Sequence, residues 1–489
     1  MIYLTGAGCG TWELLTLRAM RMIQKADCIL YDRLLDPEIL TFAPKHCDCI
    51  YVGKSAGQHA MAQEKIQQLM IEKAAQYDIV VRLKGGDPCV FGRVGEEAQA
   101  LAQAGIPFEI IPGISSGIGG LAFAGIPITH RDYASGVRIM SAHGKADTVC
   151  NLDYAWMAHT RDTLIFYMGL RQLSAIVAGL LQAGRDPKTP IALVSNASRA
   201  TQTMVTATLQ DIESRDLSAI VSPALIVVGE VVRLQEELNF MKRRPLFQKR
   251  YLLPQFADAL RELQLQLQDF GASVDCVTTG RICANPALLD TIDIKKTDVL
   301  VFSSRNAIEI FFTQLLQQKL DFRQLFAVKI AVVGEKSRQV LARNGIQADI
   351  QPEQEDSEHL ALELKKHIQK SDRIVLVKAD NDNHVLLEQL QAYAHVSLCK
   401  AYTVEAQPFA LPQHVYDGVL FTCSYHVHAC LKRLMMQQDV TRLKVYSMGS
   451  HTTKALRSYG CKQIIALPKA AKGLFGACLI EEESQYKRK

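Results

Sequence analysis

The chain has 489 residues, 48% of them hydrophobic, and a formal net charge of +5 at pH 7. This length predicts about three domains, and the hydrophobic content excludes a disordered chain. The small positive charge does not indicate a nucleic-acid partner, but it suits an acidic small molecule. Thirteen scattered cysteines favour a reducing, cytoplasmic location over a disulfide-bonded scaffold.

Three sequence features argue against targeting, membrane and metal functions. Met1 to Thr5 predicts a strand with no basic segment before it, which is not typical of a signal peptide. The longest apolar run, Ile114 to Ile128, is broken by glycines, serines and a proline and is too short to span a bilayer. Cys47 and Cys49 have no second ligand pair at zinc spacing, so we expect no metal.

The first half of the chain alternates short β-rich runs with helical patterns such as Trp12–Ala26 and Gly95–Ala104. This alternation predicts an α/β fold. The strands expected in chain order are Ile2–Leu4, Cys28–Tyr31, Ile79–Leu83, Phe108–Ile111, Val137–Ser141, Thr163–Tyr167, Pro190–Val194 and Ala224–Val228.

Loops after the first strands carry glycines and charges. Gly6 to Gly10 follows the first strand, but Thr11 stands where a dinucleotide fingerprint needs its third glycine, which argues against NAD. Asp32 and Lys54 follow neighbouring apolar segments. On position alone, they are either a base and acid pair or a structural ion pair.

The loop Gly85-Gly86-Asp87-Pro88 is the most informative segment. It follows an apolar strand, its two glycines permit a sharp turn, and its proline keeps Asp87 out of a helix. We expect a stiff loop with bare amides and one carboxylate at the end of the sheet where α/β proteins bind ligands. An ordinary strand-ending turn is the alternative.

The second half follows a basic linker, residues 239–250, and contains an internal repeat. Each copy predicts a strand, a hydroxyl-bearing loop, a helix, a strand, a glycine turn and a second helix. Gly334 to Gly345 and Gly449 to Gly460 have the same 11-residue spacing. The repeat predicts two similar α/β lobes. The loop hydroxyls are candidates for ligand contacts or for helix caps.

The segments of the first half resemble, in order, the uroporphyrinogen-III C-methyltransferase family. They are GAGCG (6–10), ELLTLRA (13–19), YDRL (31–34), PEIL (37–40), YVGK (51–54), RLKGGDP with FGR (82–93), IPFEIIPGISS (106–116), AGIPITHRDYA (124–134), FYMGL (166–170) and SPALIVVGEV (222–231). The resemblance implies two α/β lobes and S-adenosylmethionine as the cofactor.

The resemblance also implies roles for matching residues. Asp32 corresponds to the proposed general base, and Lys54 to the proposed proton donor. Predicted cofactor contacts are Cys9, Gly85, Gly86, Asp87, Val90, Ser115, Ser116, Met168 and Ala197. Cys9, Thr11 and Ala197 depart from the family's usual Pro, Asp and Gly. The substrate carries carboxylates around its rim, which cations would bind. The expected cations are Arg33, Arg93 and Arg131, with Arg82 and Lys84 as further candidates.

From about residue 245 the chain resembles the uroporphyrinogen-III synthase family, through LVFSSRNAI (300–308), AVVGEKSRQVLARNGI (331–346), SEHLALEL (357–364), AYT (401–403), LFTCS (420–424) and MGSHTTKALRSYG (448–460). The resemblance implies two lobes joined by a β-ladder and no cofactor. Tyr402 corresponds to a tyrosine that assists departure of a hydroxyl group. Predicted substrate contacts are Ser303, Ser304, Thr422, Ser424, Thr452 and Thr453. The family's Thr-Arg after the first strand is absent here.

We therefore expect a bifunctional enzyme that makes uroporphyrinogen III and methylates it twice to precorrin-2, on a route to sirohaem or cobalamin. The expected domains are a methyltransferase at 1–238 and a synthase at 245–489, with lobe one at 245–278 plus 402–489 and lobe two at 279–401. Expected partners are tetrapyrrole substrates, with no nucleic acid or membrane, and a homodimer through the methyltransferase half. The alternative is a methyltransferase for a corrinoid, diphthamide or RNA, with a non-catalytic binding module.

Overall fold

The computed structural model describes residues 1–53, 62–142, 152–257, 259–380 and 385–467, so the predicted proton donor Lys54 lies outside the described residues. The described chain divides into two compact units. Unit 1 holds Met1–Tyr251 and Leu265–Val274, and unit 2 holds Leu252–Gln264 and the described chain from Asp275 on. Both units are α/β, as predicted. No described helix has the length and apolar character that a membrane crossing requires.

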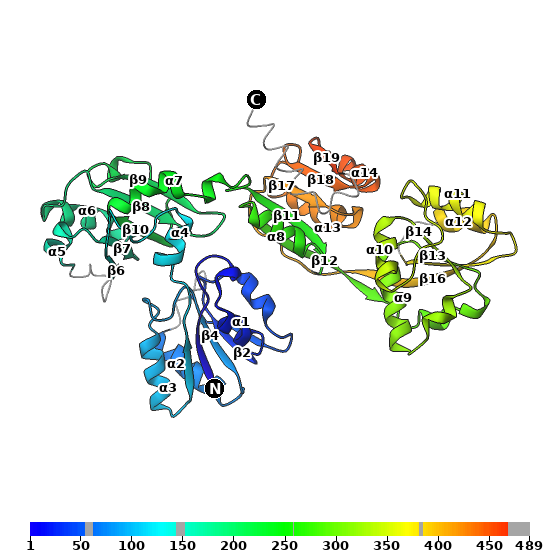
Figure 1. The fold of residues 1–489 in the computed structure, drawn as a ribbon, viewed down its shortest axis with the longest axis horizontal. Helices are drawn as coiled ribbons and strands as arrows, with labels where there is room; N and C mark the ends of the chain where they lie inside the picture. The colour runs from blue at the N-terminus through cyan, green and yellow to red at the C-terminus, as the bar shows by residue number, and fades with distance from the viewer. Residues whose placement is uncertain (54–61, 143–151, 258, 381–384, 468–489) are drawn as a thin grey trace. The chain divides into compact units, whose positions relative to one another are not determined.

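The first sheet of unit 1 is parallel throughout, with the order β3-β2-β4-β1-β5 (Figure 1). Its strands are β1 (Ile2–Gly6), β2 (Cys28–Tyr31), β3 (Asp48–Tyr51), β4 (Val80–Lys84) and β5 (Phe108–Ile111). Its helices are α1 (Leu17–Ile23), α2 (Gln63–Ala74) and α3 (Val94–Gln103). Because all strands run the same way, the loops that carry the predicted methyltransferase residues leave one edge of the sheet.

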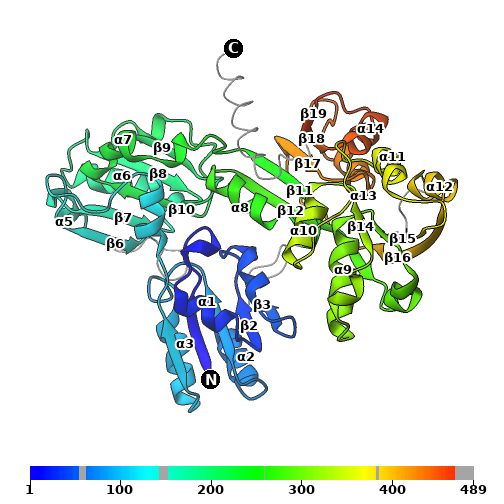
Figure 2. The ribbon, with the colours of Figure 1, turned by 45° about the vertical axis from the view of Figure 1, so that its right-hand side comes forward.

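The second sheet of unit 1 is mixed, with the order β6-β7-β10-β8-β9. Figure 2 shows its strands together, with their helices around them. The strands are β6 (Val137–Ser141), β7 (Thr163–Tyr167), β8 (Pro190–Ser195), β9 (Thr203–Thr208) and β10 (Ala224–Val228). The helices are α4 (Leu121–Phe123), which precedes the sheet, α5 (Tyr154–His159), α6 (Leu173–Gln182) and α7 (Gln235–Leu238).

Two strands and one helix of unit 1 differ from the sequence prediction. The prediction omitted β3 and β9, which are both partly exposed edge strands of their sheets. The helix expected at 12–26 is a 3-10 turn, Trp12–Leu14, followed by α1. Thr16 caps α1 by accepting a hydrogen bond from the Ala19 amide, which explains the break.

A nine-stranded sheet with the order β14-β13-β15-β16-β12-β11-β17-β18-β19 organises unit 2. Its strands are β11 (Arg250–Phe256), β12 (Ser273–Ala284), β13 (Val299–Phe302), β14 (Lys329–Val332), β15 (Arg373–Ala379), β16 (His395–Ala406), β17 (Gly418–Phe421), β18 (Lys444–Met448) and β19 (Ile464–Leu467). Its helices are α8 (Arg261–Asp269), α9 (Arg305–Gln317), α10 (Glu335–Arg343), α11 (Ser357–His367), α12 (Val385–Gln391), α13 (Ser424–Met435) and α14 (Ser450–Ser458).

The predicted repeat corresponds to β13-α9-β14-α10 and β17-α13-β18-α14. Gly345 and Gly460 follow α10 and α14 with φ of 76° and 81°. Glycine is the residue that best adopts this left-handed conformation at a helix end. The equal glycine spacing in the two copies therefore marks equal second helices.

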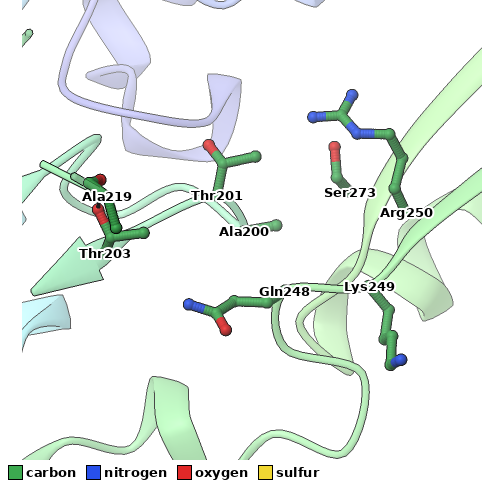
Figure 3. A pocket seen from close by; sticks show the side chains of 8 residues that line it. All are labelled: Ala200, Thr201, Thr203, Ala219, Gln248, Lys249, Arg250 and Ser273. Carbon is green, nitrogen blue, oxygen red and sulfur yellow. Dashed lines mark hydrogen bonds between the residues drawn. The ribbon is translucent and has the colours of Figure 1, made fainter. Parts of the chain in front are cut away.

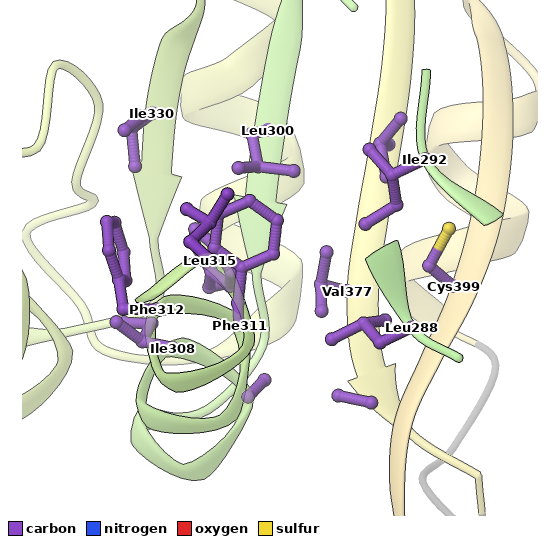
Figure 4. Packing of buried hydrophobic residues seen from close by; sticks show 14 of the residues in the cluster. Leu288, Ile292, Leu300, Ile308, Phe311, Phe312, Leu315, Ile330, Val377 and Cys399 are labelled. Carbon is purple, nitrogen blue, oxygen red and sulfur yellow. The ribbon is translucent and has the colours of Figure 1, made fainter. Parts of the chain in front are cut away.

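An aromatic cluster fills one face of the β13 end of the unit 2 sheet (Figure 4). Phe302 of β13 and Phe311 of α9 contact edge to face, with ring centroids 5.3 Å apart. Tyr402 of β16 belongs to the same cluster and is 8% exposed. The core thus holds the predicted synthase tyrosine beside the first turn of α9.

Candidate active sites

The strand-end loops of the first sheet approach one another through glycines. A Cβ added at Gly6 would lie 2.6 Å from the Gly113 Cα, which no side chain could tolerate. The loops after β1 and β4 also form a short antiparallel bridge, in which the Gly86 amide donates to the Gly8 carbonyl at 2.7 Å. These glycines therefore permit backbone packing. The Gly86 amide is not bare, contrary to the expectation for this loop.

Asp87 fastens the Gly85-Gly86 loop to its neighbours. Its Oδ1 accepts from the Cys89 amide at 2.7 Å, and its Oδ2 accepts from the Gly113 amide at 2.9 Å. The Val90 amide donates to the Asp87 carbonyl at 3.1 Å. Gly86 has φ of 72°, and an added Cβ would meet only the Ser115 Cα, at 3.8 Å. The loop is stiff, as predicted, and one side of Gly86 is open.

Tyr167, at the end of β7, connects the two sheets of unit 1. Its hydroxyl lies 2.6 Å from Ser115 Oγ and also accepts a hydrogen bond from the Gly117 amide. The Phe91 ring packs on it with centroids 5.2 Å apart. Met168 follows with φ of 56° and a side chain 52% exposed. Predicted residues from both sheets, Ser115 and Met168 among them, therefore lie around one tyrosine.

Ser116, another predicted cofactor contact, directly follows Ser115 in the chain. It begins a π-helical segment, Ser116–Gly120, which Ser115 precedes. The Ser115 carbonyl accepts from the amides of Ile118 and Gly119, at 3.0 and 2.9 Å.

The Ala197 loop packs against Cys9 and the π-helical segment. Ser198 Oγ donates to the Cys9 carbonyl at 2.7 Å. Burial raises the pKa of the Cys9 thiol. A Cβ added at Gly120 would lie 2.8 Å from the Ala197 methyl group. The extra methyl at Ala197 thus points at a glycine, which provides the space that this departure from the family pattern needs.

Asp32 follows β2 and is held by a buried arginine. Its Oδ2 accepts from Arg82 Nη2 at 3.3 Å, and the Arg82 side chain is 4% exposed. Its Oδ1 is buried and has no hydrogen-bond partner among the described residues. One carboxylate oxygen is therefore anchored by Arg82 and the other is buried, while the side chain as a whole is 29% exposed.

The predicted substrate cations fall into two groups. Arg33, Arg93 and Arg131 are exposed, and Arg93 forms an ion pair with Glu96. Arg82 and Lys84 are buried, 3% and 5% exposed, and both bind Glu97. The burial of Arg82 and Lys84 argues against the expectation that they bind the substrate's carboxylates. Both cations already have an internal carboxylate partner.

In unit 2, Tyr402 lies beside the first predicted serine loop. Its hydroxyl is 3.1 Å from Ser304 Oγ, which also caps α9 by accepting from the Ala307 amide at 3.3 Å. Ser303 Oγ is buried and has no hydrogen-bond partner among the described residues. Capping and ligand binding were alternatives for these hydroxyls, and Ser304 provides the cap.

The second hydroxyl loop of unit 2 lies at the ends of β17 and β18. Thr422 and Ser424 are partly exposed around the start of α13. Thr452 is 3% exposed, and its hydroxyl donates to the Met448 carbonyl. Thr453 Oγ1 lies 2.7 Å from Ser447 Oγ. Three of these hydroxyls thus remain candidates for substrate contact, whereas Thr452 faces its own helical turn.

A cavity of about 400 Å³ in unit 1 is lined by none of the predicted site residues (Figure 3). Thr201, Thr203, Gln248 and Ser273 supply its polar lining.

In the part of the chain that the structure describes, no cluster of histidine, cysteine and carboxylate side chains could hold a metal. Burial raises the pKa of Cys47 to about 12, and Cys49 also lowers its acidity.

Comparisons with known proteins identify the family. The families described as "Tetrapyrrole (Corrin/Porphyrin) Methylases" and "Uroporphyrinogen-III synthase HemD" match residues 1–213 and 261–476. The porphyrin biosynthesis protein HemD of Ruminiclostridium josui is 30% identical over 478 residues, 95% of each chain. The uroporphyrinogen-III C-methyltransferase of Bacillus subtilis is 38% identical over 378 residues, 75% of this chain and 77% of that protein. The chain belongs to the uroporphyrinogen-III methyltransferase–synthase family.

A solved structure also resembles the methyltransferase half of this family member. It is the uroporphyrin-III C-methyltransferase of Thermus thermophilus complexed with S-adenyl homocysteine, 40% identical, with a TM-score of 0.41. The match covers 48% of this chain and 99% of that chain.

Sequence reasoning missed three residues of the methyltransferase half that the structure brings to the site. Tyr167 lies inside the FYMGL segment, and Ser198 lies beside Ala197, so the motif comparison could have identified both. Glu97 follows the FGR segment on α3, and an acidic residue on an amphipathic helix normally predicts exposure. Its complete burial depends on cations from another element, which no local pattern reveals.

Proposed function

We propose that the second half closes hydroxymethylbilane to uroporphyrinogen III and that the first half methylates this product twice, to precorrin-2, with S-adenosylmethionine as the methyl donor. The matches to the tetrapyrrole methylase and uroporphyrinogen-III synthase families carry this proposal, because they lie in one polypeptide, and the chain is 38% identical to the uroporphyrinogen-III C-methyltransferase of Bacillus subtilis over 75% of its length. That similarity also disfavours the alternative of a corrinoid, diphthamide or RNA methyltransferase with a passive binding module.

The residues around Tyr167 suit an S-adenosylmethionine site. The open side of Gly86 allows close approach to the backbone, and the exposed Met168 side chain provides an apolar, polarisable surface. The residues that would hold the cofactor are Cys9, Gly85, Gly86, Asp87, Val90, Ser115, Ser116, Met168 and Ala197. When bound, the cofactor supplies an activated methyl group on a sulfonium centre.

The chain's own residues would orient the substrate and accept a proton. Arg33, Arg93 and Arg131 are exposed and can bind the carboxylate arms of a tetrapyrrole. Carbon methylation leaves the macrocycle with a proton to lose, and the partly exposed Asp32 carboxylate would accept it directly or through water. We keep Lys54 as the proton donor in this proposal. Fixing the reacting carbon in line with the methyl group would supply most of the acceleration.

In the synthase half, Tyr402 would assist loss of the hydroxyl group from hydroxymethylbilane. Its phenol is buried, with the hydroxyl oxygen 3.1 Å from Ser304 Oγ, so the position of the ring is set before substrate arrives. The loop hydroxyls Ser303, Thr422, Ser424 and Thr453 would contact the substrate's carboxylates. The cleft would mainly hold the linear molecule in its ring-closing shape.

The remaining proposals concern organisation. We place the domains at 1–238 and 245–489, with synthase lobes at 245–278 plus 402–489 and at 279–401. We expect a cytoplasmic protein, because the thirteen cysteines are scattered along the chain rather than spaced as in a disulfide-bonded scaffold. We also propose a homodimer through the methyltransferase half and no nucleic-acid binding; sedimentation equilibrium of the full chain, with and without RNA, tests both.

An isomer analysis of the full chain tests the two activities separately. The Asp32→Asn variant should convert hydroxymethylbilane to uroporphyrinogen III and accumulate it, whereas the unchanged chain should consume it when the methyl donor is present. If only the spontaneous type I isomer forms, the synthase half is a binding module. If preformed uroporphyrinogen III gains no methyl group from the unchanged chain, the methyltransferase proposal fails.

A further inference from the structure

Four buried or half-buried charges form a continuous cluster behind the proposed base. Arg82 Nη2 donates to Asp32 at 3.3 Å, and Arg82 Nε donates to Glu97 Oε1 at 3.4 Å. Lys84 Nζ donates to the same Glu97 oxygen at 2.8 Å. The side chains of Arg82, Lys84 and Glu97 are 4%, 6% and 0% exposed, and that of Asp32 is 29% exposed.

The fold explains how these charges meet. Arg82 and Lys84 are two residues apart on β4, so their side chains leave the same face of the sheet. Glu97 lies on α3, which begins ten residues after β4. Strand β2 pairs with β4, with Tyr31 opposite Leu83, which brings Asp32 to the end of the same strand pair.

Burial of the Glu97 carboxylate destabilises the fold unless its charge is paired. A fully buried carboxylate is tolerated only when it is paired and hydrogen-bonded. Glu97 Oε1 accepts from Arg82, Lys84 and Gln63, whereas Oε2 is buried with no partner among the described residues. With all four groups ionised, the two cations balance the two carboxylates. Burial lowers the pKa of Lys84, and neighbouring Arg82 lowers it further, so this balance depends on Glu97.

We propose that Glu97 is a positioning residue for methyl transfer: it holds Arg82 and Lys84 behind Asp32 and sets the charge that Asp32 experiences. Arg82 then anchors Asp32 Oδ2 and fixes the orientation of the carboxylate. This inference rests on the proposed role of Asp32 as the base.

Opposite charge changes in the cluster should move the Asp32 pKa in opposite directions. Glu97→Gln leaves an excess positive charge near Asp32, which favours the carboxylate and lowers its pKa. Lys84→Met leaves an excess negative charge, which raises the Asp32 pKa. We expect shifts on the order of one pH unit for such partly buried charges. The double variant restores the balance and should titrate close to the unchanged chain.

The other titratable or charged groups that face Asp32 stay the same in all these variants. Arg82 contacts it directly, Arg33 follows it in sequence, and Arg199 Nη2 donates to the nearby Leu34 carbonyl at 3.0 Å. Tyr31 and Tyr51 pack together at the strand ends with ring centroids 5.5 Å apart. Lys54, outside the described residues, is also unchanged.

The experiment uses the full chain with Glu97→Gln, Lys84→Met, the double variant and a matched control, Glu109→Gln. Glu109 is a partly exposed carboxylate on edge strand β5, bonded to Arg18. Carbon-13 NMR of labelled aspartate, assigned with Asp32→Asn, reports the Asp32 titration without any turnover. The acid limb of the turnover profile is the second readout, and circular dichroism verifies folding.

The expected result is a lower Asp32 midpoint and acid limb in Glu97→Gln, higher values in Lys84→Met, and no change in the double variant or in Glu109→Gln. Shifts in the same direction, or unshifted midpoints in folded single variants, would overturn the proposal. If neither single variant folds, the charge-balanced double variant provides the test. An Asp32 titration midpoint that differs from that of the unchanged chain would then overturn the proposal. An inactive unchanged chain with opposite NMR shifts would refute the proposed methylation but leave the charge coupling established.

Discussion

Gly120→Ala should destabilise the methyltransferase half through one contact. The backbone at Gly120 is right-handed helical, with φ of −63° and ψ of −39°, so alanine brings no backbone strain. Its Cβ would lie 2.8 Å from the Ala197 methyl and 3.4 Å from Ser116 Cβ. Overpacking of this kind costs about 1–3 kcal/mol, and the higher helix propensity of alanine offsets about 1 kcal/mol of it. We therefore expect a net loss of up to about 2 kcal/mol in the free energy of unfolding.

Ala197→Gly provides the matched control, because it removes the methyl group that Gly120→Ala meets. In the double variant the close contact disappears. Its free energy of unfolding should then lie within about 0.5 kcal/mol of the value expected if the two substitutions made no clash. Urea unfolding of all four chains measures this coupling, and calorimetry with S-adenosylhomocysteine measures its effect on the site. Strictly additive effects of the two substitutions would refute the proposed contact between Ala197 and the π-helical segment.

Further predictions address both halves of the chain. Asp32→Asn should lower turnover on uroporphyrinogen III by about 100-fold or more while calorimetry shows little change in S-adenosylhomocysteine affinity; equal losses in both would contradict its role as a base. Gly86→Ala should lower the free energy of unfolding by about 1–2 kcal/mol, because φ is 72°, and weaken that affinity, whereas Gly95→Ala, on α3 with no neighbour within 4 Å, should leave the affinity unchanged without destabilising the chain. Ser304→Ala should lose about 1 kcal/mol in urea unfolding through the lost α9 cap; an unchanged midpoint would exclude that role. Burial raises the pKa of Cys430 to about 12, so at pH 8 it stays a neutral thiol and iodoacetamide should modify it only after unfolding, as mass spectrometry can detect.

The sequence predicted every central strand of the two sheets in the first half and the edge strands β5 and β6. The prediction omitted strand β9 because all its residues are partly exposed at a sheet edge. Motif comparison placed Asp32, Ser115 and Met168 near one another through their family roles. It could not show that the Asp87 carboxylate is bonded to the backbone, because that depends on the position of Gly113.

The charge cluster illustrates the same limit. Arg82 and Lys84 looked like substrate ligands because cations in strand-end segments are usually accessible. Their burial follows from a partner, Glu97, which lies on the next helix and whose own burial no local sequence pattern indicates. Tertiary pairing of this kind changes the function inferred for a residue without changing its identity.

The most direct measurement of the central claim is a coupled reaction of the full chain with hydroxymethylbilane and isotope-labelled S-adenosylmethionine, followed by mass spectrometry of the tetrapyrrole. Our account predicts a product that carries two labelled methyl groups, with a single methylated species as its precursor. An unlabelled tetrapyrrole in the presence of folded protein would contradict it.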